Sequence, residues 1–276
     1  MSVLCTTGAF VVRDTNGENQ IFAFKTSDSV WTGFWHSQVH EETGFDSLSY
    51  GLIPQQGINA GMNETGLAVV SSFFDYTSEA LPSNSSWQGD IRGKVQAEVL
   101  SKYTSTEEAL HHFQSQFEGS IAPIGGNHIL VDSSGKIRVF EHCRGETAVE
   151  VVDQQVIRSN QAMYLFTEEQ KSQCNEIQED REKRLEQAEA VIKKLVHNPQ
   201  NVENVLHQLQ QLLSSHVGIG NELGSICAHG ISKGRSNTEE PHFTMSAMIW
   251  HINQRTMYYT EGNPCVNEWK IKEFIK

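Results

Sequence analysis

The sequence lacks the short motifs that mark the commonest cofactor and metal sites. It contains no GxxxxGK[ST] phosphate loop, no GxGxxG fingerprint, no HExxH zinc helix and no GxSxG nucleophile elbow. Its twelve histidines are scattered, and the pair His111-His112 lies in a predicted helix, where we expect both rings to be solvated. The sequence motifs therefore predict neither a cofactor nor a metal ion.

Cysteine is sparse, and acidic residues outnumber basic ones. The formal net charge of −13 argues against nucleic acid or an anionic membrane as a partner. No apolar run approaches the ~20 residues that span a bilayer, and no signal-peptide pattern opens the chain. The five cysteines are widely spaced and form no CxxC pair, which favours reduced thiols in the cytoplasm over a disulfide framework or a zinc site. They are Cys5, Cys143, Cys174, Cys227 and Cys265.

The hydrophobic pattern predicts hairpins towards both ends of the chain and two blocks of helices. Asn16-Gly17 marks the first hairpin turn, and Ser105 with Glu108 forms a capping box. The order of strands, helices, strands, helices, strands predicts two sheets with helices on both outer faces. Predicted strands cover 8–13, 20–24, 67–74, 127–132, 136–141, 148–152, 155–157, 244–253 and 256–260, and predicted helices cover 91–100, 106–117, 167–196 and 202–213.

Cys5 is the most informative residue, because only Met1-Ser2-Val3-Leu4 precedes it. Removal of those four residues would make its thiol the side chain of an N-terminal amino acid. A free α-amine has a pKa of about 7.7–8.0, so it can accept the thiol proton near neutral pH. We therefore treat residues 1–4 as a pro-segment and residues 5–276 as a single domain. The alternative is a buried cysteine at the start of the first strand.

Four segments follow one another in an order typical of one enzyme class. Cys5 comes first, Lys25-Thr26-Ser27-Asp28 second, the run GMNETGLAV over residues 61–69 third, and Arg158-Ser159-Asn160-Gln161 fourth. This set resembles the cysteine-type N-terminal nucleophile (Ntn) hydrolases. It is most similar to the family of acyl-coenzyme A:6-aminopenicillanic acid acyltransferase and to choloylglycine hydrolases and penicillin V acylases. The resemblance implies an α+β fold, a four-layer αββα sandwich of two antiparallel sheets flanked by helices.

The resemblance also implies catalytic roles for four residues. Cys5 would attack the substrate carbonyl and form an acyl-enzyme, and Asp28 would hold its amine and tune the amine pKa. Lys25 would orient Asp28 and lower the thiol pKa. Asn160 would donate to the oxyanion, a contribution of about 3–4 kcal/mol. Without the resemblance, the same residues are read as a turn carboxylate, a solvated lysine and a cap.

Three weaker candidates complete the expected site. Ser72 stands where the family often has an asparagine, so a second oxyanion donor would be a backbone N–H at Ser72 or Phe73. Arg235, in the run Lys233-Gly234-Arg235-Ser236-Asn237, is the candidate for a substrate-binding arginine.

The expected reaction is hydrolysis of a linear, non-peptide carbon–nitrogen (amide) bond in a small molecule. Loops at 29–60 and 77–90 would shape the pocket, and their aromatic side chains suggest an apolar acyl group. Three alternatives remain open: an acyltransferase of the same fold, an unprocessed non-catalytic ligand-binding member, and a helical interaction protein whose working surface is 167–213. A homo-oligomer is compatible with the resemblance. The aromatic residues are Trp31, Phe34, Trp35, Phe45, Phe73, Phe74, Tyr76 and Trp87.

Overall fold

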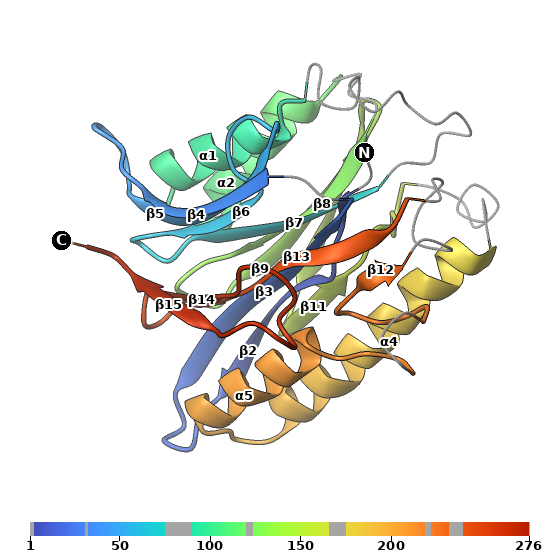
Figure 1. Ribbon diagram of the computed structural model, residues 1–276. Coiled ribbons are helices and arrows are strands. Elements are labelled where there is room, and N and C mark those ends of the chain that lie inside the picture. Colours follow the sequence, from blue (N-terminus) through green and yellow to red (C-terminus); the bar gives the residue numbers. More distant parts are fainter. Residues whose placement is uncertain are drawn as a thin grey trace.

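Two antiparallel sheets pack face to face, and a pair of helices covers the outer face of each (Figure 1). The structure is a computed structural model that describes residues 3–30, 33–74, 90–119, 124–165, 175–218, 222–231 and 240–275. The layer order is the αββα order that the resemblance implies. Among the described residues, no helix combines the length and the apolarity needed to cross a membrane.

The first sheet has eight strands in the order β11-β2-β3-β13-β14-β15, with β1 also paired to β3 and β12 to β13. Helices α4 and α5 cover it. These elements are β1 (Val3–Leu4), β2 (Thr7–Arg13), β3 (Asn19–Ser29), β11 (Gln155–Arg158), β12 (His229–Ile231), β13 (His242–His251), β14 (Thr256–Tyr259), β15 (Lys270–Glu273), α4 (Asn175–His197) and α5 (Val202–Leu213).

The second sheet has seven strands in the order β10-β9-β8-β7-β6-β5-β4. Helices α1 and α2 cover it. These elements are β4 (Gly33–Val39), β5 (Ser47–Ile53), β6 (Ala60–Asn63), β7 (Ala68–Phe74), β8 (Gly125–Val131), β9 (Ile137–Cys143), β10 (Glu146–Val152), α1 (Arg92–Lys102) and α2 (Thr106–Phe117).

Strand β2 illustrates why the central strands are apolar on both faces. Ala9 and Val11 face the core between the two sheets, whereas Phe10 and Val12 face the core beneath α4 and α5. Successive side chains of a strand point to opposite faces, so a strand in an inner layer buries the side chains of both faces, and in β2 these are mostly apolar. This continuous run places the start of β2, directly after Cys5, deep in the molecule.

Helix α4 forms one outer layer of the sandwich. Its buried residues Ala188, Ile192 and Leu195 pack into the same core as Phe10 and Phe22 of the sheet. Residues 175–213, which form α4 and α5, are the described part of the predicted helical segment 167–213. The predicted amphipathic character of this part is therefore confirmed. The segment is therefore an integral layer of the sandwich and not a separate module, and an interaction role for its charged face stays a prediction.

The region 29–60 differs most from the sequence prediction. Instead of loops around a pocket it contains β4, β5 and β6, and β3 extends to Ser29 instead of ending at residue 24. Lys25 and Asp28 are therefore strand residues, and the turn interpretation of Asp28 is wrong. The polar residues of this buried strand have hydrogen-bond partners on other elements, such as Cys5, Ser71 and Thr244, which the hydrophobic pattern does not reveal. The expected loop 77–90 falls outside the described residues apart from Asp90.

Two stacked histidines between α2 and the second sheet predict a loss of stability in mild acid. The Ser71 hydroxyl donates to Gln96 Oε1 (2.9 Å), so it accepts from His128 Nδ1 (2.8 Å). His128 Nε2 is then unprotonated and accepts from His142 Nε2 (3.1 Å). Burial holds the pKa of both rings well below its usual value. Both histidines are therefore neutral in the folded protein.

The unfolded chain takes up protons near pH 6.5, and the folded chain does not. Stability is therefore present above that pH and falls as the pH drops below it, by about 1.4 kcal/mol per pH unit for each buried histidine. Urea unfolding between pH 7.5 and 5.5 measures this slope. His142→Phe should reduce the slope of the unfolding free energy against pH by the equivalent of about one proton, or about 1.4 kcal/mol per pH unit. His111→Gln changes an exposed histidine and should leave this slope unchanged. An unchanged slope in His142→Phe would contradict the assignment.

Candidate active site

Strand pairing brings Lys25 and Asp28 to either side of Cys5. On β3, Lys25 lies opposite Thr7 of β2, and Asp28 lies opposite Leu4 of β1. Cys5 is in the short step between β1 and β2, so the register places it against the stretch from Lys25 to Asp28. Cys5, Lys25 and Asp28 are all completely buried.

Lys25 contacts the Cys5 thiol directly. Its Nζ lies 2.8 Å from Cys5 Sγ and also donates to the Ser71 carbonyl of the opposite sheet. The positive charge lowers the thiol pKa, as expected, but burial is the larger effect, and the pKa of Cys5 is raised overall. In this state, with Leu4 still attached, the thiol is protonated at neutral pH and needs a base before it can attack.

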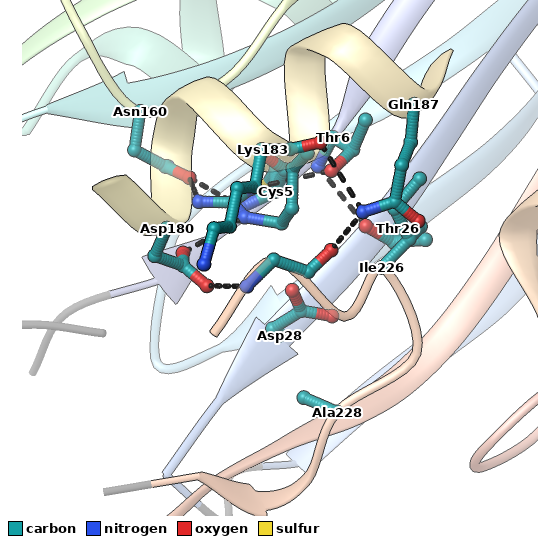
Figure 2. A network of polar contacts seen from close by, with 12 residues as sticks. Cys5, Thr6, Thr26, Asp28, Asn160, Asp180, Lys183, Gln187, Ile226 and Ala228 are labelled. Atoms are coloured by element: carbon teal, nitrogen blue, oxygen red, sulfur yellow. Dashed lines mark hydrogen bonds and ion pairs between the residues drawn. The ribbon is translucent and has the colours of Figure 1, made fainter. Parts of the chain in front are cut away.

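Asn160 lies beside Cys5 in a different orientation from the expected one (Figure 2). Its Oδ1 accepts the backbone N–H of Cys5 (2.8 Å), and its Nδ2 donates to the Phe73 carbonyl (2.6 Å). The side chain thus links β7 to the peptide bond that precedes Cys5. One of its two amide N–H groups thus donates to Phe73, and a role of Asn160 as oxyanion donor stays a prediction.

Asp28 is held through a threonine from β13. Thr244 Oγ1 donates to Asp28 Oδ1 (2.7 Å) and accepts the backbone N–H of Ala228 (2.8 Å). The carboxylate therefore has a fixed position close enough to Cys5 to raise the thiol pKa. The sequence prediction included Asp28 but not Thr244 or Ala228.

Arg184 and Asp180 of α4 are the most important site residues that the sequence analysis missed. Arg184 Nη1 donates to the Cys5 carbonyl (2.7 Å) and to Thr6 Oγ1 (3.2 Å), while Nη2 reaches Asn160 Oδ1 (3.4 Å). Its Nε pairs with Asp180 Oδ2 (2.9 Å), and Asp180 Oδ1 accepts the Gly224 N–H (2.9 Å). This buried ion pair fixes the backbone of Cys5.

A sequence signal for these two residues did exist. The buried stripe of α4 includes Ile177, Ala188 and Ile192, and helical spacing places Asp180 and Arg184 in the interval on that same face. Charged residues inside an apolar stripe are expensive to bury unless they are paired. Such an i,i+4 pair therefore points to a specific buried role.

The weaker candidates have mixed outcomes. The Ser72 hydroxyl donates to the Ser159 carbonyl (2.7 Å), and the Phe73 carbonyl accepts from Asn160. Both residues border the site but are engaged by the protein itself. Arg235 lies outside the described residues, as do Trp31, Tyr76 and Trp87. Of the other expected pocket aromatics, Phe73 and Phe74 are buried core residues, and Phe34 and Trp35 pack against the cores.

The αββα sandwich of two antiparallel sheets is the fold of the Ntn hydrolases. The family model described as acyl-coenzyme A:6-aminopenicillanic acid acyl-transferase matches residues 26–265. The chain therefore belongs to this family. A search of curated protein sequences returned no match.

Solved structures agree with this family. Penicillin V acylase from Agrobacterium tumefaciens superposes with a TM-score of 0.59 at 13% identity, over 97% of this chain and 86% of that one. The Caenorhabditis elegans ortholog of N-acylethanolamine-hydrolyzing acid amidase superposes with a TM-score of 0.55 at 13% identity, over 90% of this chain and 93% of that one. A mutant of the conjugated bile acid hydrolase from Clostridium perfringens superposes with a TM-score of 0.55 at 13% identity, over 98% of this chain and 97% of that one. At such identity the similarity establishes the fold alone.

Proposed function

We propose that this protein is a cysteine Ntn amidohydrolase that cleaves a linear, non-peptide amide bond after autocatalytic removal of residues 1–4. One observation carries the proposal: the Cys5 thiol is buried 2.8 Å from the Lys25 ammonium, between strands that also bring Asp28 to it. A buried thiol with a cationic neighbour and a fixed carboxylate has the groups needed for covalent catalysis.

Maturation would begin at the peptide bond between Leu4 and Cys5. The Cys5 thiol gives up its proton as Sγ attacks the Leu4 carbonyl carbon, and the C–N bond breaks as the nitrogen takes up that proton and becomes a free amine. The resulting thioester is then hydrolysed by water, which releases residues 1–4 with a new carboxylate. Arg184 and Asn160 hold the Cys5 carbonyl and N–H, so they fix the scissile peptide relative to the thiol.

The mature site would then use the same thiol on an external amide. The Cys5 amine accepts the thiol proton, Cys5 Sγ forms an acyl-enzyme, and the protonated amine delivers its proton to the leaving nitrogen. Asp28 would keep the amine in place. Water would complete hydrolysis. An acyltransferase would instead admit a second amine, and exclusion of water from the acyl-enzyme decides between the two.

The substrate class rests on the family and on the structural relatives. The relatives' names describe acylases and hydrolases of penicillin V, N-acylethanolamines and conjugated bile acids, all small amides. We therefore propose a small amide with an apolar acyl group. The Phe73 ring belongs to the same hydrophobic cluster as Cys5, which supports an apolar acyl group, and its centroid lies 3.8 Å from the guanidinium carbon of Arg92.

The intact mass of the purified full-length chain tests the proposal. We expect a loss equal to Met-Ser-Val-Leu, followed by hydrolysis of apolar N-acyl amides and a thioester adduct at Cys5 when turnover is quenched in acid. A chain that retains Leu4 and hydrolyses no member of an amide panel would favour the non-catalytic ligand-binding member. Product formed only when an acceptor amine is added would favour the acyltransferase.

A further inference from the structure

Two cysteines and two histidines gather on the first sheet, outside the catalytic site. They are His216, Cys227, His229 and Cys265, and one side-chain ligand atom from each lies within 4.8 Å of the others. The sequence separates them too widely for a metal motif, since Cys227 and Cys265 are 38 positions apart. The fold brings them together from the turn after α5, the entry to β12 and the turn after β14.

Two of the three ligand-atom distances within this cluster are close to those of a tetrahedral metal site, and the third is shorter. Cys227 Sγ lies 3.6 Å from Cys265 Sγ and 3.6 Å from His229 Nε2, and His229 Nε2 lies 3.0 Å from Cys265 Sγ. Bonds of about 2.3 Å from zinc to sulfur and about 2.0–2.1 Å to nitrogen give separations in a tetrahedron of about 3.8 Å between two sulfurs, about 3.6 Å between sulfur and nitrogen, and about 3.3 Å between two nitrogens. Binding of the ion would therefore lengthen the His229–Cys265 distance by about 0.6 Å. His216 completes the set, with its ring centroid 5.0 Å from that of His229.

The two thiols are free, so no disulfide accounts for their proximity. Asn263 supports the cluster from outside. Its Nδ2 lies 3.7 Å from Cys227 Sγ and donates to the Ala228 carbonyl (2.6 Å). A hydrogen bond of this kind to a ligand sulfur is a common support of thiolate–metal sites.

From this geometry we propose that His216, Cys227, His229 and Cys265 bind one Zn²⁺ as a closed, structural Cys₂His₂ site. Four protein ligands leave no open position for substrate or water, which distinguishes a structural zinc from a catalytic one. Two thiolates neutralise the charge of the ion, and the mixed sulfur and nitrogen ligands favour Zn²⁺ over Mg²⁺ or Ca²⁺. Cys227 is buried and His216 is exposed, so the ion has a route from solvent.

The position of the cluster gives the zinc a structural task. Cys227 precedes Ala228, whose N–H is accepted by Thr244, and Thr244 in turn holds Asp28. The ion would therefore tie the end of α5, the 225–231 segment and the C-terminal turn to the strand that positions Asp28. The metal site itself does not depend on the proposed amidase activity, because none of its ligands contacts Cys5 in any described hydrogen bond.

Metal analysis of untagged protein, purified without chelators, tests the site. We expect about one zinc per chain in the native protein and in His207→Gln, which changes an exposed histidine of α5. His216→Gln and Cys265→Ser should each lower the affinity for zinc at least tenfold in a competition with a chromogenic chelator. Cobalt loaded in place of zinc should give the intense visible bands of a tetrahedral thiolate complex in the native protein only.

Three results would overturn the proposal: less than about 0.1 metal per chain with no uptake of added zinc, an intact mass showing a Cys227–Cys265 disulfide in freshly purified protein, or undiminished zinc affinity in both ligand variants. Circular dichroism of His216→Gln guards against a folding artefact, since this exposed side chain is not part of a core. A metal other than zinc in the native protein, bound through the same four residues, would overturn the choice of ion.

Discussion

Cys5→Ala is expected to abolish both removal of residues 1–4 and amide turnover. Loss of a nucleophile costs about 10⁶-fold in enzymes that depend on it, so amide turnover should fall by about that factor, and any residual rate comes from substrate binding and oxyanion stabilisation. The fold should survive, because alanine leaves only a sulfur-sized void in the core. Intact mass and a product assay with an apolar N-acyl amide measure the two effects.

Cys143→Ala is the matched control for this experiment. Cys143 is also a buried thiol, but it ends β9 and packs with Phe74 and Ala162. We expect the Cys143→Ala variant to lose residues 1–4 and to hydrolyse the amide as the native protein does. If Cys5→Ala processed as the native chain does, another group would be cleaving the peptide bond. If Cys5→Ala had the same intact mass and the same ligand binding as the native chain, the protein would be a non-catalytic binding member of the family.

Arg184→Met is expected to destabilise the protein by about 3–5 kcal/mol, because it leaves the Asp180 carboxylate buried without its partner. Both side chains are essentially inaccessible to solvent. For a chain of this size the melting temperature should fall by about 6–20 °C. Urea unfolding in the Cys5→Ala background measures the loss without interference from processing.

The neighbouring Lys183 provides the control. It pairs with Glu179 at the same i,i+4 spacing and a distance of 2.6 Å, but both side chains are half exposed. Lys183→Met should leave the free energy of unfolding nearly unchanged, because solvent screens an exposed ion pair. Adding Asp180→Leu to Arg184→Met should restore part of the lost stability by removing the orphaned charge. A loss below about 1 kcal/mol in Arg184→Met alone would show that Asp180 finds another partner or a proton.

The local sequence was enough for most secondary structure and for the family. The Asn16-Gly17 turn, the capping box of α2 and the amphipathic pattern of α4 and α5 are each decided by residues a few positions apart. Ser105 accepts the Glu108 N–H, as the capping box predicts. The ordered motifs that begin with Cys5 belong to this level too, because they need only their spacing along the chain.

Buried polar strands were the main failure of sequence reasoning. Residues 25–29 of β3 look like a turn because Lys, Thr, Ser and Asp are usually solvated. In the fold both faces of that strand are covered. The hydrogen-bond partners of its polar side chains are Cys5, Ser71 and Thr244. A hydrophobic pattern cannot report a strand whose side chains are satisfied by other elements.

The sequence by itself determined that Cys5, Lys25, Asp28 and Asn160 were the residues to examine. Only the tertiary structure decided what they contact. Asn160 meets Cys5 across 155 positions, and Arg184 reaches it across 179. The same holds for the cluster of His216, Cys227, His229 and Cys265. Hydrogen bonds and metal ligation act over about 2–4 Å in space, and the sheet pairing that creates such proximity depends on the packing of the whole chain.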